Sequence, residues 1–118
     1  MVQKRHVNAT DLYTMLACVV IMGHDISGFK TNDTENEIAY LRRGAFNELK
    51  STIYNALDCH ECNGGVSGNG NERKFSKDEL IKALDFLGTN EDYEPERKFV
   101  SDCLANIDEN GNVLVGFY

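Results

Sequence analysis

The sequence predicts an all-α fold of four to five helices. Apolar residues recur every three or four positions in several stretches, which is the period of an amphipathic helix. One later stretch also carries a capping box, which begins a helix. With 118 residues, 42% of them hydrophobic and 26% charged, the chain can bury a core of its own. We therefore expect one domain over 1–118, with a helix and loop over 1–33, a helical pair over 34–118 and a glycine-rich insertion at 58–74.

The first predicted helix covers residues 11–22. It is apolar on almost all sides, which is typical of a helix buried on most of its faces. Gly23 follows it at the position where helices commonly end. Residues 24–36 are polar and include Gly28, and we expect them to form a loop. The apolar run is shorter than the roughly 18 residues needed to span a bilayer.

The second predicted helix covers residues 34–57, because five apolar residues recur there at every fourth position: Leu41, Ala45, Leu49, Ile53 and Leu57. Such a stripe indicates one buried helix face. Four of the ten glycines in the chain then fall between residues 64 and 70. Glycine makes a segment entropically costly to order, so we expect a long loop at this point.

The third and fourth predicted helices have the clearest start signals. Ser76 and Glu79 have the spacing of a capping box, and Gly88 marks the end of the helix that follows. The fourth helix begins near Pro95, the only proline in the chain, because proline suits the first turn. Residues 108–112 then predict a turn, and the apolar residues 113–118 are compatible with a short strand.

Residues around the last turn have the spacing of a cation-binding loop. Asn106, Asp108 and Asn110 fall at positions 1, 3 and 5, Gly111 at position 6 and Val113 at position 8. Here the sequence resembles the EF-hand family, as a calmodulin-like helix-loop-helix pair over residues 41–118.

The resemblance extends upstream, where Phe75 and Glu79 match positions 8 and 12 of a preceding EF-hand loop. It implies a paired, degenerate EF-hand-like fold with a minimal two-strand contact between the segments of Phe75 and Val113. It also implies that any bound calcium has as ligands Asn106, Asp108, Asn110 and Asn112.

This loop departs from the family pattern at the ligands that matter most. Position 12, where the family has a bidentate glutamate, is Phe117, and position 9 is Leu114. Asp108 is the only acid among the expected side-chain ligands. Because ligand charge sets calcium affinity, the sequence predicts very weak calcium binding and no required cofactor.

Cys59 and Cys62 form a C-x-x-C pair, which is half of a zinc site. The remaining ligands would come from Cys18, Cys103 and the three histidines. One alternative is a redox pair, which is disfavoured because the pair follows a helix instead of preceding one. The other is two ordinary loop thiols. Four cysteines are too few for a disulfide scaffold in a chain of this length. We therefore expect reduced thiols and a cytoplasmic protein.

The net charge of −7 disfavours direct binding to nucleic acid or to an anionic membrane and favours a basic partner. No catalytic motif appears, so we expect no enzyme activity. The resemblance implies a calmodulin- or light-chain-like adaptor that binds a basic or amphipathic helical segment of another protein without calcium. Its groove would be lined by Leu80, Leu84, Leu87, Phe99, Val100 and Leu104. The alternatives are a small acidic inhibitor of the phage type, which mimics nucleic acid to block a nucleic-acid-binding protein, and a zinc-stabilised binding module.

Overall fold

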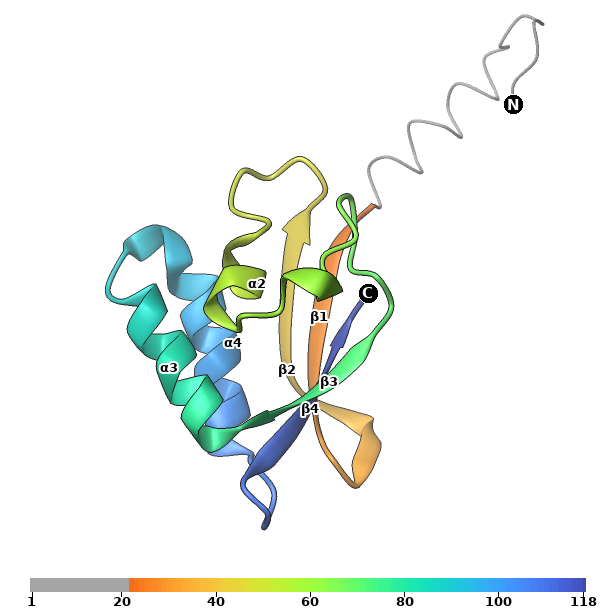
Figure 1. The fold of residues 1–118 in the computed structure, drawn as a ribbon, viewed down its shortest axis with the longest axis vertical. Helices are drawn as coiled ribbons and strands as arrows, with labels where there is room; N and C mark the ends of the chain where they lie inside the picture. The colour runs from red at the N-terminus through yellow and green to blue at the C-terminus, as the bar shows by residue number, and fades with distance from the viewer. Residues whose placement is uncertain (1–21) are drawn as a thin grey trace, which may run out of the picture.

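A four-stranded antiparallel sheet organises the computed structural model, which describes residues 22–118 (Figure 1). The strands are β1 (Gly23–Lys30), β2 (Asp33–Gly44), β3 (Glu72–Ser76) and β4 (Asn112–Phe117), in the order β2-β1-β4-β3. The helices are α2 (Thr52–Ala56), α3 (Lys77–Leu87) and α4 (Glu94–Ala105), with 3₁₀ turns η1 (His60–Cys62) and η2 (Glu91–Tyr93). The fold is α/β, so the all-α prediction and the EF-hand resemblance are both wrong.

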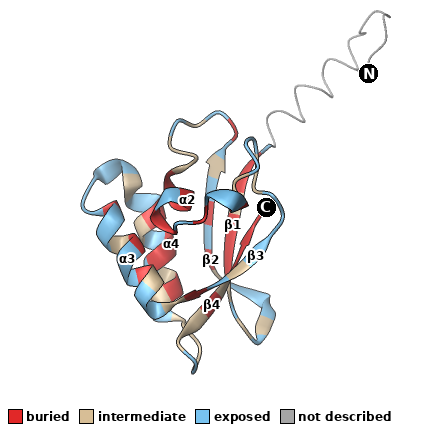
Figure 2. Cartoon of the chain, viewed as in Figure 1, coloured by how far each residue is buried: buried red, intermediate tan, exposed pale blue. Residues whose placement is uncertain are grey.

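All three helices lie on one face of the sheet. A Cβ atom built on Gly28 in β1 would lie 2.9 Å from the Sγ of Cys103 in α4, so α4 packs directly on the backbone of β1. The ring of His24, also in β1, meets the ring of Tyr54 in α2 at 5.5 Å. Because side chains four residues apart in a strand point to the same face, α2 and α4 cover the same side. Figure 2 shows the buried residues gathered where the helices meet the strands.

The first half of the described chain differs most from the sequence prediction. Residues 24–36, expected to form a loop, and much of 34–57, expected to form a helix, make the β1–β2 hairpin. Its register runs from Gly23 opposite Gly44 to Gly28 opposite Ala39, with a bulge at Ile38. The four-residue spacing of Leu41 and Ala45 misled the prediction because four is also a multiple of the strand period of two.

The second half agrees with the sequence at its helix ends. Ser76 caps α3 by accepting a hydrogen bond from the Glu79 amide at 3.2 Å, and the Glu79 carboxylate accepts one from the Ser76 amide at 3.0 Å. Gly88 follows α3 with a φ of 57°. Pro95 lies in the first turn of α4. The capping box, the glycine stop and the proline start are therefore confirmed.

The predicted contact between Phe75 and Val113 exists, but it is not minimal. It is one of five residue pairs that join β3 to β4. β4 in turn pairs with β1, so both segments are embedded in the sheet. This arrangement excludes the isolated pair of cation-binding hairpins that the resemblance implied.

The predicted N-terminal helix at 11–22 lies, apart from Met22, outside the described residues. Between residues 22 and 118, no helix has the length and apolar character needed to cross a bilayer.

Candidate functional site

The segment predicted to bind calcium is an Asx-rich turn. The Asp108 carboxylate accepts hydrogen bonds from the amides of Asn110 and Asn112, both at 2.9 Å, and from the hydroxyl of Thr31 in the β1–β2 turn. The bond from Thr31, followed by the backbone bonds, holds the pKa of Asp108 below its usual value. Gly111 completes the turn with a φ of 79°. The carboxylate therefore holds the turn and connects it to the β1–β2 hairpin.

The other predicted metal ligands are not brought together. The Asn106 side chain donates to the carbonyl of Asp102 at 2.8 Å, at the end of α4. Cys59 and Cys62 lie side by side, whereas Cys103 lies on α4 against β1. Across residues 22–118, no group of three or more His, Cys, Asp or Glu side chains is placed to hold a metal ion. Cys18, the remaining cysteine, lies outside the described residues.

The six residues predicted to line a partner groove belong to the core instead. Four of them are at most 2% exposed: Leu80, Leu87, Phe99 and Val100. Leu84 and Leu104 are partly buried and pack against the same cluster. These side chains fill the space between α3, α4 and the sheet, so a partner surface has to be sought elsewhere.

His24 and Tyr54 form a buried polar pair beside the glycine-rich loop. His24 Nε2 lies 2.9 Å from the carbonyl oxygen of Gly65, and Nδ1 lies 2.6 Å from the Tyr54 hydroxyl. A carbonyl only accepts, so Nε2 carries the proton and donates. In the neutral ring, Nδ1 accepts a hydrogen bond from the Tyr54 hydroxyl. Burial lowers the pKa of His24, with Lys50 and Arg42 acting in the same direction and the Gly65 carbonyl and Asp25 opposing them.

Acid is expected to destabilise the protein through His24. Its folded-state pKa lies below the usual histidine pKa of about 6.5, so below about pH 6.5 the unfolded chain binds more protons than the native one. The stabilisation is present above that pH and is lost as the pH falls through the folded pKa. The His24→Gln variant has no titrating side chain at this position. We expect it to be less stable than wild type at about pH 7.5, but to lose less free energy of unfolding than wild type between about pH 7 and 5. Urea unfolding across this pH range gives the slope of the free energy of unfolding against pH for each protein. Equal slopes for wild type and His24→Gln would contradict the lowered pKa of His24.

Cys59 precedes η1 and Cys62 is its last residue, next to the His24–Tyr54 pair. The Cys62 amide donates a hydrogen bond to the Cys59 carbonyl at 3.0 Å. Both residues are buried. Burial raises the pKa of each thiol, and the nearby Glu61 adds to the effect while Arg73 opposes it.

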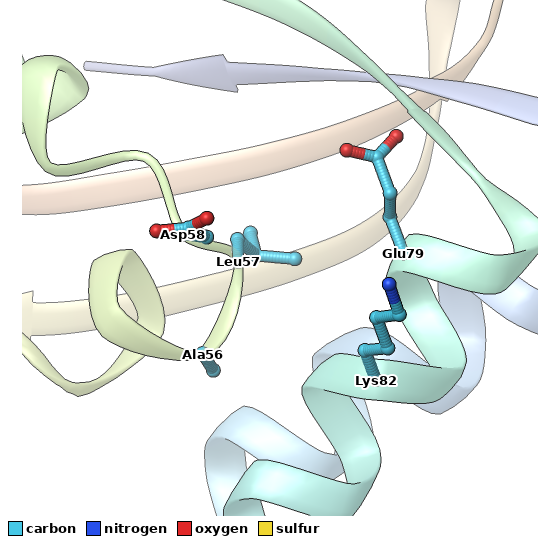
Figure 3. A pocket seen from close by; sticks show the side chains of 5 residues that line it. All are labelled: Ala56, Leu57, Asp58, Glu79 and Lys82. Carbon is cyan, nitrogen blue, oxygen red and sulfur yellow. The ribbon is translucent and has the colours of Figure 1, made fainter.

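A small pocket lies between the end of α2 and the first turns of α3 (Figure 3). Its lining residues are Ala56, Leu57, Asp58, Glu79 and Lys82, and its volume is about 140 Å³. Sites for drug-sized ligands usually measure about 300–1,000 Å³. Glu79 is also occupied in capping α3. The pocket has room for water or a small ion and offers little surface for recognition.

The face of the sheet opposite the helices carries a different pattern, and we call it the open face. One row of register partners runs across all four strands: Glu37, Phe29, Leu114 and Lys74. The two central members are apolar and partly buried, while the charged members lie on the edge strands β2 and β3. An apolar centre inside a charged rim is the usual anatomy of a protein interface.

Two tyrosines extend the open face. Tyr40 is 51% exposed and donates a hydrogen bond to Asp25, which also accepts one from Arg42 at 2.7 Å. Partial burial alone would raise the pKa of Asp25, but the bonds from Tyr40 and Arg42 hold this pKa below its usual value. Tyr118 is 45% exposed. Its ring lies over Gly116, where a Cβ atom would collide with it.

The sequence prediction missed the open face because β2 was interpreted as a helix. The available signal was the alternation of Ala39 and Leu41, which are buried, with Tyr40 and Arg42, which are exposed. Such alternation indicates a half-buried strand. In comparisons with known proteins, no family model, no curated protein and no solved structure matches the chain. The open face is therefore the site on which a functional proposal rests.

Proposed function

We propose that this protein is a non-enzymatic interaction module that binds another protein through the open face of its sheet. The observation that carries the proposal is the apolar centre of Phe29 and Leu114, extended by the exposed Tyr40 and Tyr118. Tyrosine is among the residues that contribute most to protein interfaces, because its ring supplies apolar area and its hydroxyl a hydrogen bond. This surface takes the place of the groove predicted between the third and fourth helices.

The partner surface that fits best is basic, with aliphatic groups at its centre. The net charge of −7 attracts a basic protein over long range. Glu37 and Glu72 provide carboxylates on the two edge strands, where a rim contact would form. Aliphatic groups of the partner would cover Phe29 and Leu114. Binding of this kind requires neither calcium nor another cofactor. It also requires no direct contact with nucleic acid or membrane.

We also propose a cytoplasmic location. Its support is that Cys59, Cys62 and Cys103, the cysteines inside the described range, are all free thiols. Free thiols are the usual state of cysteine in the reducing cytosol.

Site-specific photo-crosslinking in the native cells tests the proposed function. A photoreactive phenylalanine derivative replaces Tyr40 on the open face or, as the matched control, Phe86 on α3, which is 56% exposed. We expect a discrete protein adduct from position 40 and none of the same mass from position 86. Adding Leu114→Lys should reduce the adduct at least tenfold without changing the unfolding temperature, because a charge then lies at the centre of the interface.

Two outcomes would contradict the proposal: the same adduct from both positions, or an adduct unaffected by Leu114→Lys. The identity of the adduct also separates the alternatives. If the captured partner is a nucleic-acid-binding protein, and it crosslinks through carboxylate-rich surfaces instead of position 40, the acidic-inhibitor hypothesis is favoured. The zinc-stabilised module stays a prediction that elemental analysis of the purified full chain decides.

A further inference from the structure

We propose that Cys59 and Cys62 are a redox-active pair that closes to an intramolecular disulfide by exchange with a low-molecular-weight disulfide such as oxidised glutathione. The proposal concerns the far side of the sheet from the open face and is independent of the proposed partner.

The geometry of η1 brings the two cysteines together. Cys59 precedes the turn and Cys62 ends it, and the 3.0 Å bond from the Cys62 amide to the Cys59 carbonyl closes an i to i+3 turn. Such a turn holds its first and last Cα atoms within about 7 Å, and disulfides form when the Cα atoms are about 4.4–6.8 Å apart. The turn therefore places the two cysteines at a separation that a disulfide can span, and both side chains are buried.

No other role competes for this pair in the part of the chain described. A third metal ligand is not placed beside it there. Cys103 is held against Gly28 on the α4 side of the core, so it is not positioned to pair with either thiol. The two cysteines therefore have each other as their reaction partner.

The surroundings favour the oxidised form and slow its formation. Burial raises the pKa of both thiols, and Arg73, the cation that opposes this effect, is itself paired with Glu61 at 2.6 Å. The phenol of Tyr54 and the neutral ring of His24 nearby supply no positive charge. Strongly oxidising pairs are those whose reduced thiolate is stabilised. Here the thiolate is disfavoured, so a disulfide, once formed, should resist reduction.

The exchange proceeds in two balanced steps. When η1 opens locally, the thiolate of Cys62, which is 2% exposed in the closed structure whereas Cys59 is 0% exposed, attacks one sulfur of the small disulfide, forming a mixed disulfide and releasing one thiolate, which takes a proton. The thiolate of Cys59 then attacks the Cys62 sulfur and releases the second small thiolate, which is also protonated. The protein loses two electrons and two protons, and one small disulfide is reduced to two thiols.

Mass spectrometry of the wild-type full chain tests the inference without a destabilising variant. The protein is incubated with mixtures of oxidised and reduced glutathione and quenched with acid. We expect the mass to fall by two hydrogens without a retained glutathione adduct. Protease cleavage after Glu61, which lies between the two cysteines, should yield two peptides that stay joined until a reductant is added. The rate should rise about tenfold per pH unit below the thiol pKa, because the thiolate is the nucleophile.

Two results would overturn the inference. In one, Cys59 and Cys62 stay free thiols at glutathione ratios that oxidise a reference C-x-x-C protein in the same tube. In the other, the disulfide maps to Cys18 or Cys103. The Cys62→Ser variant serves as a further control and should give at most a mixed disulfide on Cys59.

Discussion

Replacing Glu96 with alanine is expected to lower the free energy of unfolding by about 3–5 kcal/mol, the usual cost of breaking a buried ion pair. Glu96 lies on α4 and is 0% exposed. Its two carboxylate oxygens each accept a hydrogen bond from Arg43 on β2 at 2.7 Å. The variant leaves the Arg43 guanidinium, whose side chain is 14% exposed, without its counter-charge. Urea unfolding monitored by circular dichroism gives the difference.

The double variant Arg43→Met with Glu96→Leu is the matched control. Because two apolar side chains replace the whole pair, it should be much closer to wild type than Glu96→Ala. The Arg43 guanidinium also donates to the Asp92 carbonyl at 2.9 Å, and the double variant loses this bond as well. A double variant as unstable as the single one would mean that lost packing, rather than an unpaired charge, causes the loss.

Replacing Phe117 with alanine is the second large effect, with an expected cost of about 3–5 kcal/mol. Its ring is 0% exposed, and the ring centroids of Tyr54 and Phe75 lie 5.6 Å and 6.3 Å away. The substitution opens a cavity where β4, β3 and α2 meet. Thermal and urea unfolding both measure the loss.

Phe86→Ala is the control for this aromatic truncation. The Phe86 side chain is exposed on α3, and exposed substitutions usually change stability by less than about 0.5 kcal/mol. If both truncations cost the same, Phe117 would not be the central core residue that the structure indicates.

Phe117 also explains why the calcium pattern was misleading. The residue counted as position 12 of an EF-hand loop is a core residue of β4. Asparagine and aspartate at alternate positions followed by glycine suit both a cation loop and an Asx turn, because their side-chain oxygens can either coordinate a cation or accept hydrogen bonds from backbone amides. In this protein the amides of Asn110 and Asn112 use the Asp108 carboxylate. The sequence alone did not separate the two.

The sequence predicted the local features of the second half and not the sheet. Capping residues, a glycine stop and a proline start act over a few residues, so they can be recognised without knowing the fold. β1 has no such signal. Its buried face carries Gly28 and His24, where large apolar residues are expected in a strand. Gly28 is there because α4 packs too close for a larger side chain, and His24 is there because its ring bonds the Tyr54 hydroxyl. The open face was hidden for the same reason, since its residues share a surface only once β1 and β2 pair.

The position of β4 has a consequence for how the chain folds during synthesis. Among the strands of residues 22–118, β4 alone joins β3 to the β1–β2 hairpin, and its Phe117 pairs with Ile26 of β1, far away in the sequence. Long-range strand pairing is slow because a long loop must close before the contacts form. A nascent chain on the ribosome therefore exposes one edge of β1 until β4 has been synthesised and has left the exit tunnel, and a nascent-chain chaperone could bind this edge in the interval.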